Sequence, residues 1–174
     1  MKIAISGKSG CGNSTVSRLV AKRLGYRLVN YTFHSVAQEL GVSFDEMCEM
    51  AEQDDKWDRY VDRRQVEMAR RGDTVLGSRL AIWVLDDADF RVYLDAPTDV
   101  RASRIQRREG GTFEEVRDKT GERDQRDHDR YLRLYGINNN DFGFVDLVID
   151  TQDLTQDEVA DRIVRAAEER GARD

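Results

Sequence analysis

A chain of 174 residues with 39% hydrophobic residues is long enough to bury one core and too short for two independent domains. Its formal net charge of -6 leaves no overall basic field, so nucleic acid is not an expected partner. The longest apolar runs have the length of strands, no hydrophobic signal core follows Met1-Lys2, and Cys11 and Cys48 are too few for a disulfide framework. We therefore expect a cytoplasmic protein with no membrane partner.

The first predicted strand, Ile3-Ala4-Ile5, leads into a glycine-rich segment that reads Gly7-Lys8-Ser9-Gly10-Cys11-Gly12-Asn13-Ser14-Thr15. Apolar spacing predicts a helix from Ser14 to Leu24. A strand, a glycine loop and a helix in succession place backbone N–H groups and a helix N-terminus around one concavity, which can hold a phosphate chain. The alternative is a tight turn that binds nothing. The G-x-x-x-x-G-x-S spacing, together with the strand and the helix, favours a phosphate-binding loop.

Asn13 stands at the position that lysine occupies in this pattern. An asparagine side chain can donate a hydrogen bond to a phosphate oxygen, but it brings no positive charge. Lys8, the second residue of the loop, is the nearest residue that could supply the missing charge over the β- and γ-phosphates. We therefore count Lys8 and Asn13 among the candidate catalytic residues.

The rest of the chain alternates between strand and helix signals. Strands are predicted at 26–29, 74–76, 90–95 and 147–150, and helices over 32–72 with brief breaks, from about Thr98, and over 155–170. We expect the charged segment 100–135 to be interrupted at Gly110-Gly111 and again near Gly121. This order predicts a three-layer α/β/α fold of the P-loop NTPase type around a five-stranded, largely parallel sheet. Ligands in such folds bind beyond the carboxyl ends of the strands.

Several arginines share one helical face or follow a predicted strand. If 117–133 is helical, Arg123, Asp127 and Arg130 lie on one stripe of the helix. Arg126, one position from Asp127, lies beside this stripe. A solvated face of interchangeable charges is the alternative interpretation. Further arginines close the third strand and follow the fourth: Arg79, Arg101, Arg104, Arg107 and Arg108. Guanidinium groups that converge near a phosphate-binding loop suit phosphoryl transfer, because its transition state spreads negative charge over oxygens.

A set of different short motifs is spread along the whole chain. They are Ile5-Ser6-Gly7, Asp62-Arg63-Arg64-Gln65, Ser78-Arg79-Leu80-Ala81 with Trp83, Asp95-Ala96-Pro97 with Val100-Arg101-Ala102, Arg104-Ile105, Arg108-Glu109, Glu122-Arg123 to Arg130-Tyr131, Tyr135-Gly136-Ile137 and Asp146-Leu147-Val148-Ile149. With these motifs the chain resembles the short, archaeal-type cytidylate kinases of the P-loop nucleoside monophosphate kinase family over essentially its full length. The resemblance implies a monomer that transfers the γ-phosphoryl group of ATP to CMP or dCMP with Mg²⁺.

The resemblance also implies a role for each candidate residue. Gly7 to Thr15 would cradle the ATP phosphates, and the Ser14 hydroxyl would ligate Mg²⁺. The acceptor nucleotide would be bound by Arg79, Arg123, Asp127 and Arg130, with Arg101 assisting. Arg104, Arg108 and Arg126 would belong to a lid that closes on the transferring group. The single domain would comprise a core (1–31, 72–108 and 142–174), a monophosphate-binding insertion (about 32–71) and a lid region (about 109–141).

Two positions depart from the family pattern. The family usually carries an arginine in the first helix after the second strand, and here only His34 is near that place. It also tends to carry a carboxylate at the end of the third strand, where this chain has Gly77. Two alternatives to a cytidylate kinase therefore stay open. One is a P-loop kinase with another nucleotide or small-molecule acceptor, and the other is a nucleotide-binding module with weak or no catalysis.

Overall fold

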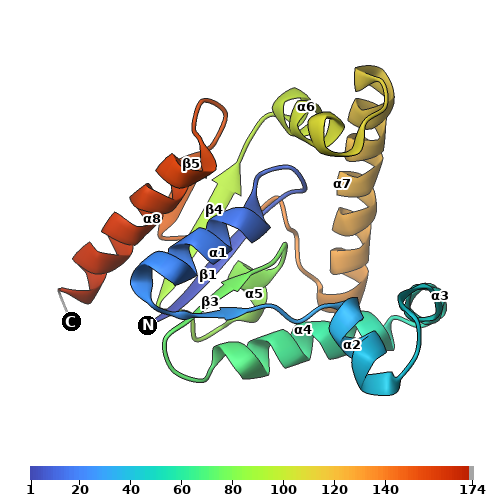
Figure 1. The fold of residues 1–174 in the computed structure, drawn as a ribbon, viewed down its shortest axis with the longest axis horizontal. Helices are drawn as coiled ribbons and strands as arrows, with labels where there is room; N and C mark the ends of the chain where they lie inside the picture. Colours follow the sequence, from blue (N-terminus) through green and yellow to red (C-terminus); the bar gives the residue numbers. More distant parts are fainter. Residues whose placement is uncertain (173–174) are drawn as a thin grey trace.

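Five parallel strands form one sheet in the order β2-β3-β1-β4-β5 in the computed structural model, which describes residues 1–172 (Figure 1). The strands are β1 (Lys2–Gly7), β2 (Arg27–Val29), β3 (Thr74–Gly77), β4 (Phe90–Asp95) and β5 (Leu147–Asp150). β1 is central, with Ile3 opposite Val75 of β3 and Phe90 of β4. The predicted parallel sheet is confirmed, and its carboxyl edge brings the segments after β1, β3 and β4 together.

Helices cover both faces of the sheet, which explains why its central strand is apolar on both sides. On one face Ile5 packs with Val20 of α1 (Asn13–Leu24) and Ile163 of α8 (Gln156–Gly171). α8 starts at a capping box in which the Thr155 side chain accepts from the Glu158 N–H, the arrangement that a threonine followed three residues later by a glutamate predicts. Within residues 1–172, no helix is long and apolar enough to cross a membrane.

The opposite face of the sheet packs against α4 (Lys56–Ala69) and the one-turn helix α5 (Ala81–Val84). Leu76 and Tyr93 from the sheet meet Ile82 of α5 in this core. The sequence does not predict α5, because a single helical turn is too short to show a periodic apolar pattern. Its contact with the sheet holds the segment after β3 at the carboxyl edge.

The segment between β2 and β3 forms the predicted helical insertion, made of α2 (Phe33–Leu40), α3 (Phe44–Gln53) and α4. It has a hydrophobic cluster of its own, with Val36, Met47 and Val61 at its centre. Figure 1 shows α2 and α3 at one end of the molecule, beside the far end of α7 and away from β5 and α8. The insertion therefore packs as a unit with its own small core.

The long charged segment differs from the prediction at one point. α6 (Thr98–Glu109) ends before Gly110-Gly111 as expected, but α7 (Phe113–Tyr135) continues through Gly121 without a break. A helical glycine costs about 1 kcal/mol relative to alanine, and α7 offsets this with a capping box at its start, a glycine C-cap and buried side chains along its length. As one rigid element, α7 runs from α6 to the insertion (Figure 1).

Candidate active site

The loop between β1 and α1 has the geometry of a phosphate-binding loop. Gly10 (φ 87) and Gly12 (φ 95) adopt positive φ angles, which L side chains rarely tolerate, and α1 begins at Asn13. The loop and the first turn of α1 therefore border a cavity of about 860 Å³, an arrangement in which backbone N–H groups can bind a phosphate chain. Every loop residue from Lys8 to Thr15 lines this cavity, as the sequence predicts for a nucleotide site.

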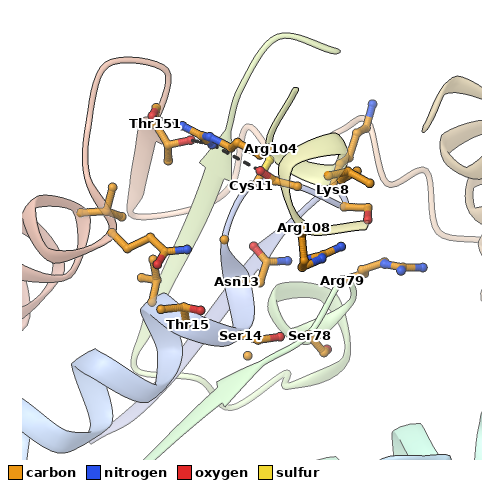
Figure 2. A pocket seen from close by; sticks show the side chains of 18 of the residues that line it. Lys8, Cys11, Asn13, Ser14, Thr15, Ser78, Arg79, Arg104, Arg108 and Thr151 are labelled. Carbon is orange, nitrogen blue, oxygen red and sulfur yellow. Dashed lines mark hydrogen bonds between the residues drawn. The ribbon is translucent and has the colours of Figure 1, made fainter. Parts of the chain in front are cut away.

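Asn13 closes the loop on itself. Its Nδ2 donates to the carbonyl oxygen of Gly7 at 2.6 Å, so the amide spans the width of the loop. Figure 2 shows the Lys8 side chain extending from the loop away from Asn13 and Ser14, whereas the Arg108 side chain is drawn between those of Asn13 and Arg79. The cavity beside Asn13 is thus flanked by guanidinium groups, and the role of Lys8 as the replacing cation stays a prediction.

Cys11 is the loop residue that turns into the core. It is 3% exposed, and burial raises the pKa of its thiol to about 11. Because the thiolate is the reactive form, iodoacetamide at mildly alkaline pH is expected to modify the half-buried Cys48 and to spare Cys11. Peptide mapping by mass spectrometry would show this, with urea-unfolded protein as the control in which both thiols react. Equal labelling of the two cysteines in the folded protein would contradict the prediction.

Five of the predicted basic residues reach the cavity beside the loop: Lys8, Arg79, Arg104, Arg108 and Arg123. Two of them bind the loop itself. Arg104 donates to the carbonyl oxygen of Gly10 (3.3 Å) and to the Thr151 hydroxyl (2.9 Å), and Arg123 donates to the Ser9 hydroxyl (3.1 Å) (Figure 2 shows Arg104 and Thr151). Arg108 is 64% exposed and pairs with Glu109. These contacts place cations around the space that a phosphate chain would fill.

A second, smaller hollow of about 160 Å³ lies beyond Arg79, between α4 and α7. Arg79 Nη1 donates to Asp127 Oδ2 at 2.6 Å, and Arg130 bridges Asp127 (3.5 Å) and Asp58 of α4 (3.0 Å). Burial raises the pKa of Asp58, and the Arg130 guanidinium partly offsets this rise. Arg79 lines both this hollow and the cavity beside the loop. The predicted stripe of Arg123, Asp127 and Arg130 therefore faces the site and is not a solvated surface.

Two predicted site residues are placed differently by the structure. Arg101 is 2% exposed and does not line the cavity, because all three of its guanidinium nitrogens are engaged by protein oxygens. It therefore cannot assist acceptor binding by direct contact. Arg126 is exposed on another face of α7, where it lines a groove with Phe33 and Cys48 instead of the loop cavity. The expected convergence of Arg126 on the transferring group is not seen in this structure.

The two departures from the family pattern have different structural settings. His34 is exposed and stacks on Phe44, with ring centroids 3.7 Å apart, so it does not replace a phosphate-binding arginine in this structure. Gly77 packs against α1, and a Cβ at this position would overlap the Ser17 side chain. A carboxylate at position 77 would therefore require α1 to shift.

Several residues that build the site were not predicted from the sequence. Thr151 and Gln156 line the loop cavity, although about 140 residues separate them from the loop. Ser6 Oγ donates to the carbonyl oxygen of Ser78 at 2.8 Å and so fixes the segment that carries Arg79. Asp124 holds Arg101 through two hydrogen bonds. No local pattern marks these residues, because only the strand order brings them to the loop.

A central parallel strand that ends in a phosphate-binding loop, with an arginine-lined cavity beside it, defines a P-loop nucleotide-binding protein with the machinery of a phosphotransferase. Residues 2–153 match the model of the cytidylate kinase-like family. The chain belongs to this family, and the resemblance inferred from the sequence motifs is confirmed.

Individual relatives agree with the family assignment. The chain is 46% identical to "Cytidylate kinase 2" of Borreliella afzelii (strain PKo), with 94% of both chains covered. It is 42% identical to "Cytidylate kinase" of Pyrococcus furiosus, covering 95% of this chain and 86% of the relative. Shikimate kinase from Acinetobacter baumannii in complex with shikimate shares the fold, with a TM-score of 0.64 at 20% identity over 96% of this chain and 92% of that chain. The three-layer P-loop fold is thereby confirmed.

Proposed function

We propose that the protein transfers the γ-phosphoryl group of ATP to CMP or dCMP, giving ADP and CDP or dCDP. The observation that carries this proposal is the position of Arg79, which lines both the cavity at the phosphate-binding loop and the hollow beside Asp127 and Arg130. A protein that only bound nucleotide would have no use for a second anion site next to the first. The cytidylate kinase names of the relatives support cytosine as the acceptor base.

On the donor side, the loop N–H groups and the start of α1 bind the ATP phosphates. Arg123 and Arg104 hold Ser9 and Gly10 of the loop in place through the contacts described above. Lys8 and Arg108 are cations on the cavity wall, and together they would supply the charge that Asn13 lacks. Asn13 keeps the loop at its width through its hydrogen bond to the Gly7 carbonyl.

Mg²⁺ fits the loop through the Ser14 hydroxyl and the phosphate oxygens of the nucleotide. Within residues 1–172, no cluster of His, Cys, Asp or Glu could hold a metal ion by itself. P-loop proteins use the Ser or Thr hydroxyl at this position of the loop as a ligand of Mg²⁺, together with nucleotide phosphates, and the ion keeps several of its waters. The exposed Ser14 on the cavity wall would hold the ion, which neutralises charge on the transferring group when bound.

On the acceptor side, the side chains that now pair with one another would exchange partners. Arg79 would release Asp127 and bind the acceptor phosphate, since a guanidinium group matches phosphate in a bidentate geometry. Asp127 would accept a hydrogen bond from the exocyclic amino group of cytosine, and Arg130 would donate to the ring acceptors. Uracil presents a carbonyl oxygen where cytosine has this amino group, so the Asp127 carboxylate disfavours UMP.

Two moving parts would surround these sites. The insertion, about 32–71, carries Asp58 and would close over the acceptor, and the region of about 109–141 would act as the lid. Gly110 (φ 82) and Gly111 (φ 90) supply flexible backbone at the junction of α6 and α7. Closure would exclude water, which otherwise would accept the phosphoryl group.

The protein would work as a cytoplasmic monomer. Light scattering during size-exclusion chromatography measures the molar mass in solution and so tests the monomeric state.

The proposal is tested by a coupled ADP-release assay with ATP and Mg²⁺ against CMP, dCMP, UMP, AMP and GMP, with a reaction lacking acceptor as control. We expect turnover with CMP or dCMP to exceed that with UMP by at least about tenfold, as expected when a buried polar group must pair with the base. Faster turnover with another nucleotide would show that the acceptor site binds that base and not cytosine. No acceptor-dependent turnover, with ATP still bound, would reduce the protein to a nucleotide-binding module.

A further inference from the structure

Arg101, at the start of α6, is a buried arginine with an unusually complete set of partners. Its Nε donates to the carbonyl oxygen of Ala96 at 3.2 Å, and its Nη2 donates to the Thr98 hydroxyl at 3.2 Å. Asp124 of α7 accepts from Nη1 at 3.1 Å and from Nη2 at 2.6 Å. A charge at this depth is tolerated only when it is paired and hydrogen-bonded, so this ion pair is a built feature of the fold.

The remaining partner of Arg101 is the phosphate-binding loop. Nη1 also donates to the carbonyl oxygen of Ser9 at 3.1 Å. A trans peptide places the C=O of one residue and the N–H of the next on opposite sides, so this bond directs the N–H of Gly10 away from Arg101. Gly10 lines the cavity and Arg101 does not, so the orientation suits donation to a phosphate. Arg101 therefore fixes one of the donor groups of the loop without touching the cavity.

The loop also rests directly on the backbone of α6. A Cβ built on Gly10 would lie 2.9 Å from Arg101 Cβ and 2.9 Å from its carbonyl oxygen. On the other side, Arg123, the residue before Asp124, donates to the Ser9 hydroxyl at 3.1 Å. Ser9 is thus held through both its carbonyl and its hydroxyl by residues of α6 and α7.

α7 then continues to the second site. Asp127 lies one turn after Asp124 and pairs with Arg79, and Arg130 follows one turn later. Because α7 is an unbroken helix, a change in the position of Asp124 moves the loop and the acceptor-binding residues relative to one another. The pair of Arg101 and Asp124 lies where these two sets of contacts join.

We propose that Arg101 and Asp124 are positioning residues, whose buried ion pair orients the Ser9 peptide for ATP binding and sets the loop at its working distance from the acceptor residues of α7. The part of this inference that concerns the distance to the acceptor residues rests on the proposed function. The orientation of the Ser9 peptide concerns ATP binding alone. Neither side chain lines the cavity at the loop, so both would act through the loop and through α7.

The test compares Asp124→Asn, Asp124→Glu and Arg101→Lys with the wild type by calorimetric titration with ATP in the absence of acceptor. We expect Asp124→Asn and Arg101→Lys to raise the dissociation constant for ATP by about tenfold, the size expected for one misplaced charge-assisted hydrogen bond. Separate titration with CMP alone is expected to change by less than about threefold, because the acceptor residues keep their own contacts on α7. A purely structural role would leave both dissociation constants unchanged.

The matched control is Asp99→Asn, which breaks the exposed ion pair of Asp99 with Arg117 between the same two helices but away from the loop. It is expected to change neither dissociation constant. Asp124→Glu retains the charge and serves where asparagine or lysine prevents folding, and we expect it to weaken ATP binding by about threefold because the longer side chain displaces the guanidinium.

Thermal melting followed by circular dichroism establishes which variants are folded at the titration temperature. ATP dissociation constants within twofold of the wild type in every folded variant, even with lowered melting temperatures, would overturn the proposal. A wild type that binds ATP but does not phosphorylate CMP would overturn the proposed function instead, and the ATP comparison would still decide the role of the pair.

Discussion

Replacement of Arg79 by alanine is expected to lower kcat/KM for CMP about 100-fold, since charged hydrogen bonds contribute about 1.5–3 kcal/mol each and the phosphate contact strengthens during transfer. Among the residues that line both cavities, Arg79 is the cationic one, so its loss removes the cation between donor and acceptor. ATP affinity measured without acceptor is expected to change little, because the loop contacts come from Arg104 and Arg123. The coupled assay and calorimetry give the two quantities.

Two further variants sharpen this prediction. Arg79→Lys keeps the charge but loses the bidentate geometry, so we expect an intermediate kcat/KM. Arg165→Ala removes an exposed arginine of α8 and is the matched control, with activity expected to equal that of the wild type. A value of kcat/KM for CMP that falls less than threefold in Arg79→Ala would place the acceptor phosphate elsewhere.

Substitution of Gly10 by alanine is expected to have the largest effect on the donor site. At φ 87 a side chain is strained by about 1–2 kcal/mol. The new Cβ would also meet the backbone of Arg101 at 2.9 Å, and such overpacking costs about 1–3 kcal/mol more. We expect the free energy of unfolding to fall by about 2–5 kcal/mol and ATP affinity to fall at least tenfold, because the loop must leave Arg101. Urea unfolding and calorimetric titration measure both.

Gly12→Ala separates the two contributions. Gly12 has a similar φ of 95°, but its nearest neighbour would lie 3.6 Å from an added Cβ, so only the backbone strain applies. We expect a loss of about 1–2 kcal/mol in the free energy of unfolding. If Gly10→Ala proved no more harmful than Gly12→Ala, close packing between the loop and α6 would not constrain the loop.

The parallel sheet, the phosphate-binding loop and the capping of α8 could be predicted because each depends on residues close together in the sequence. Apolar runs bounded by turns mark the strands, and glycines at fixed spacing mark the loop. The interruption predicted near Gly121 is wrong, because a single glycine does not by itself end a helix. A helix of this length tolerates it when both ends are capped and Tyr131 is buried on its inner face.

The side-chain partners within the site could not be predicted in the same way. Arg101, Arg104 and Arg108 occur on one short helix and look equivalent in the sequence, yet the structure buries the first against Asp124, ties the second to the loop and Thr151, and leaves the third exposed. Helical periodicity indicates which residues share a face. It does not indicate which face meets the loop.

For this protein the sequence by itself determined the class of fold, the phosphate-binding loop and the family, since these depend on local spacing and on motifs spread along the chain. Only the tertiary structure decided that Arg79 joins the two cavities, that Arg126 faces away from the loop, and that Arg101 acts from beneath it. The physical reason is that an arginine has the same chemistry wherever it stands. Its role is set by which carboxylates and carbonyl oxygens the folded chain brings within hydrogen-bond distance.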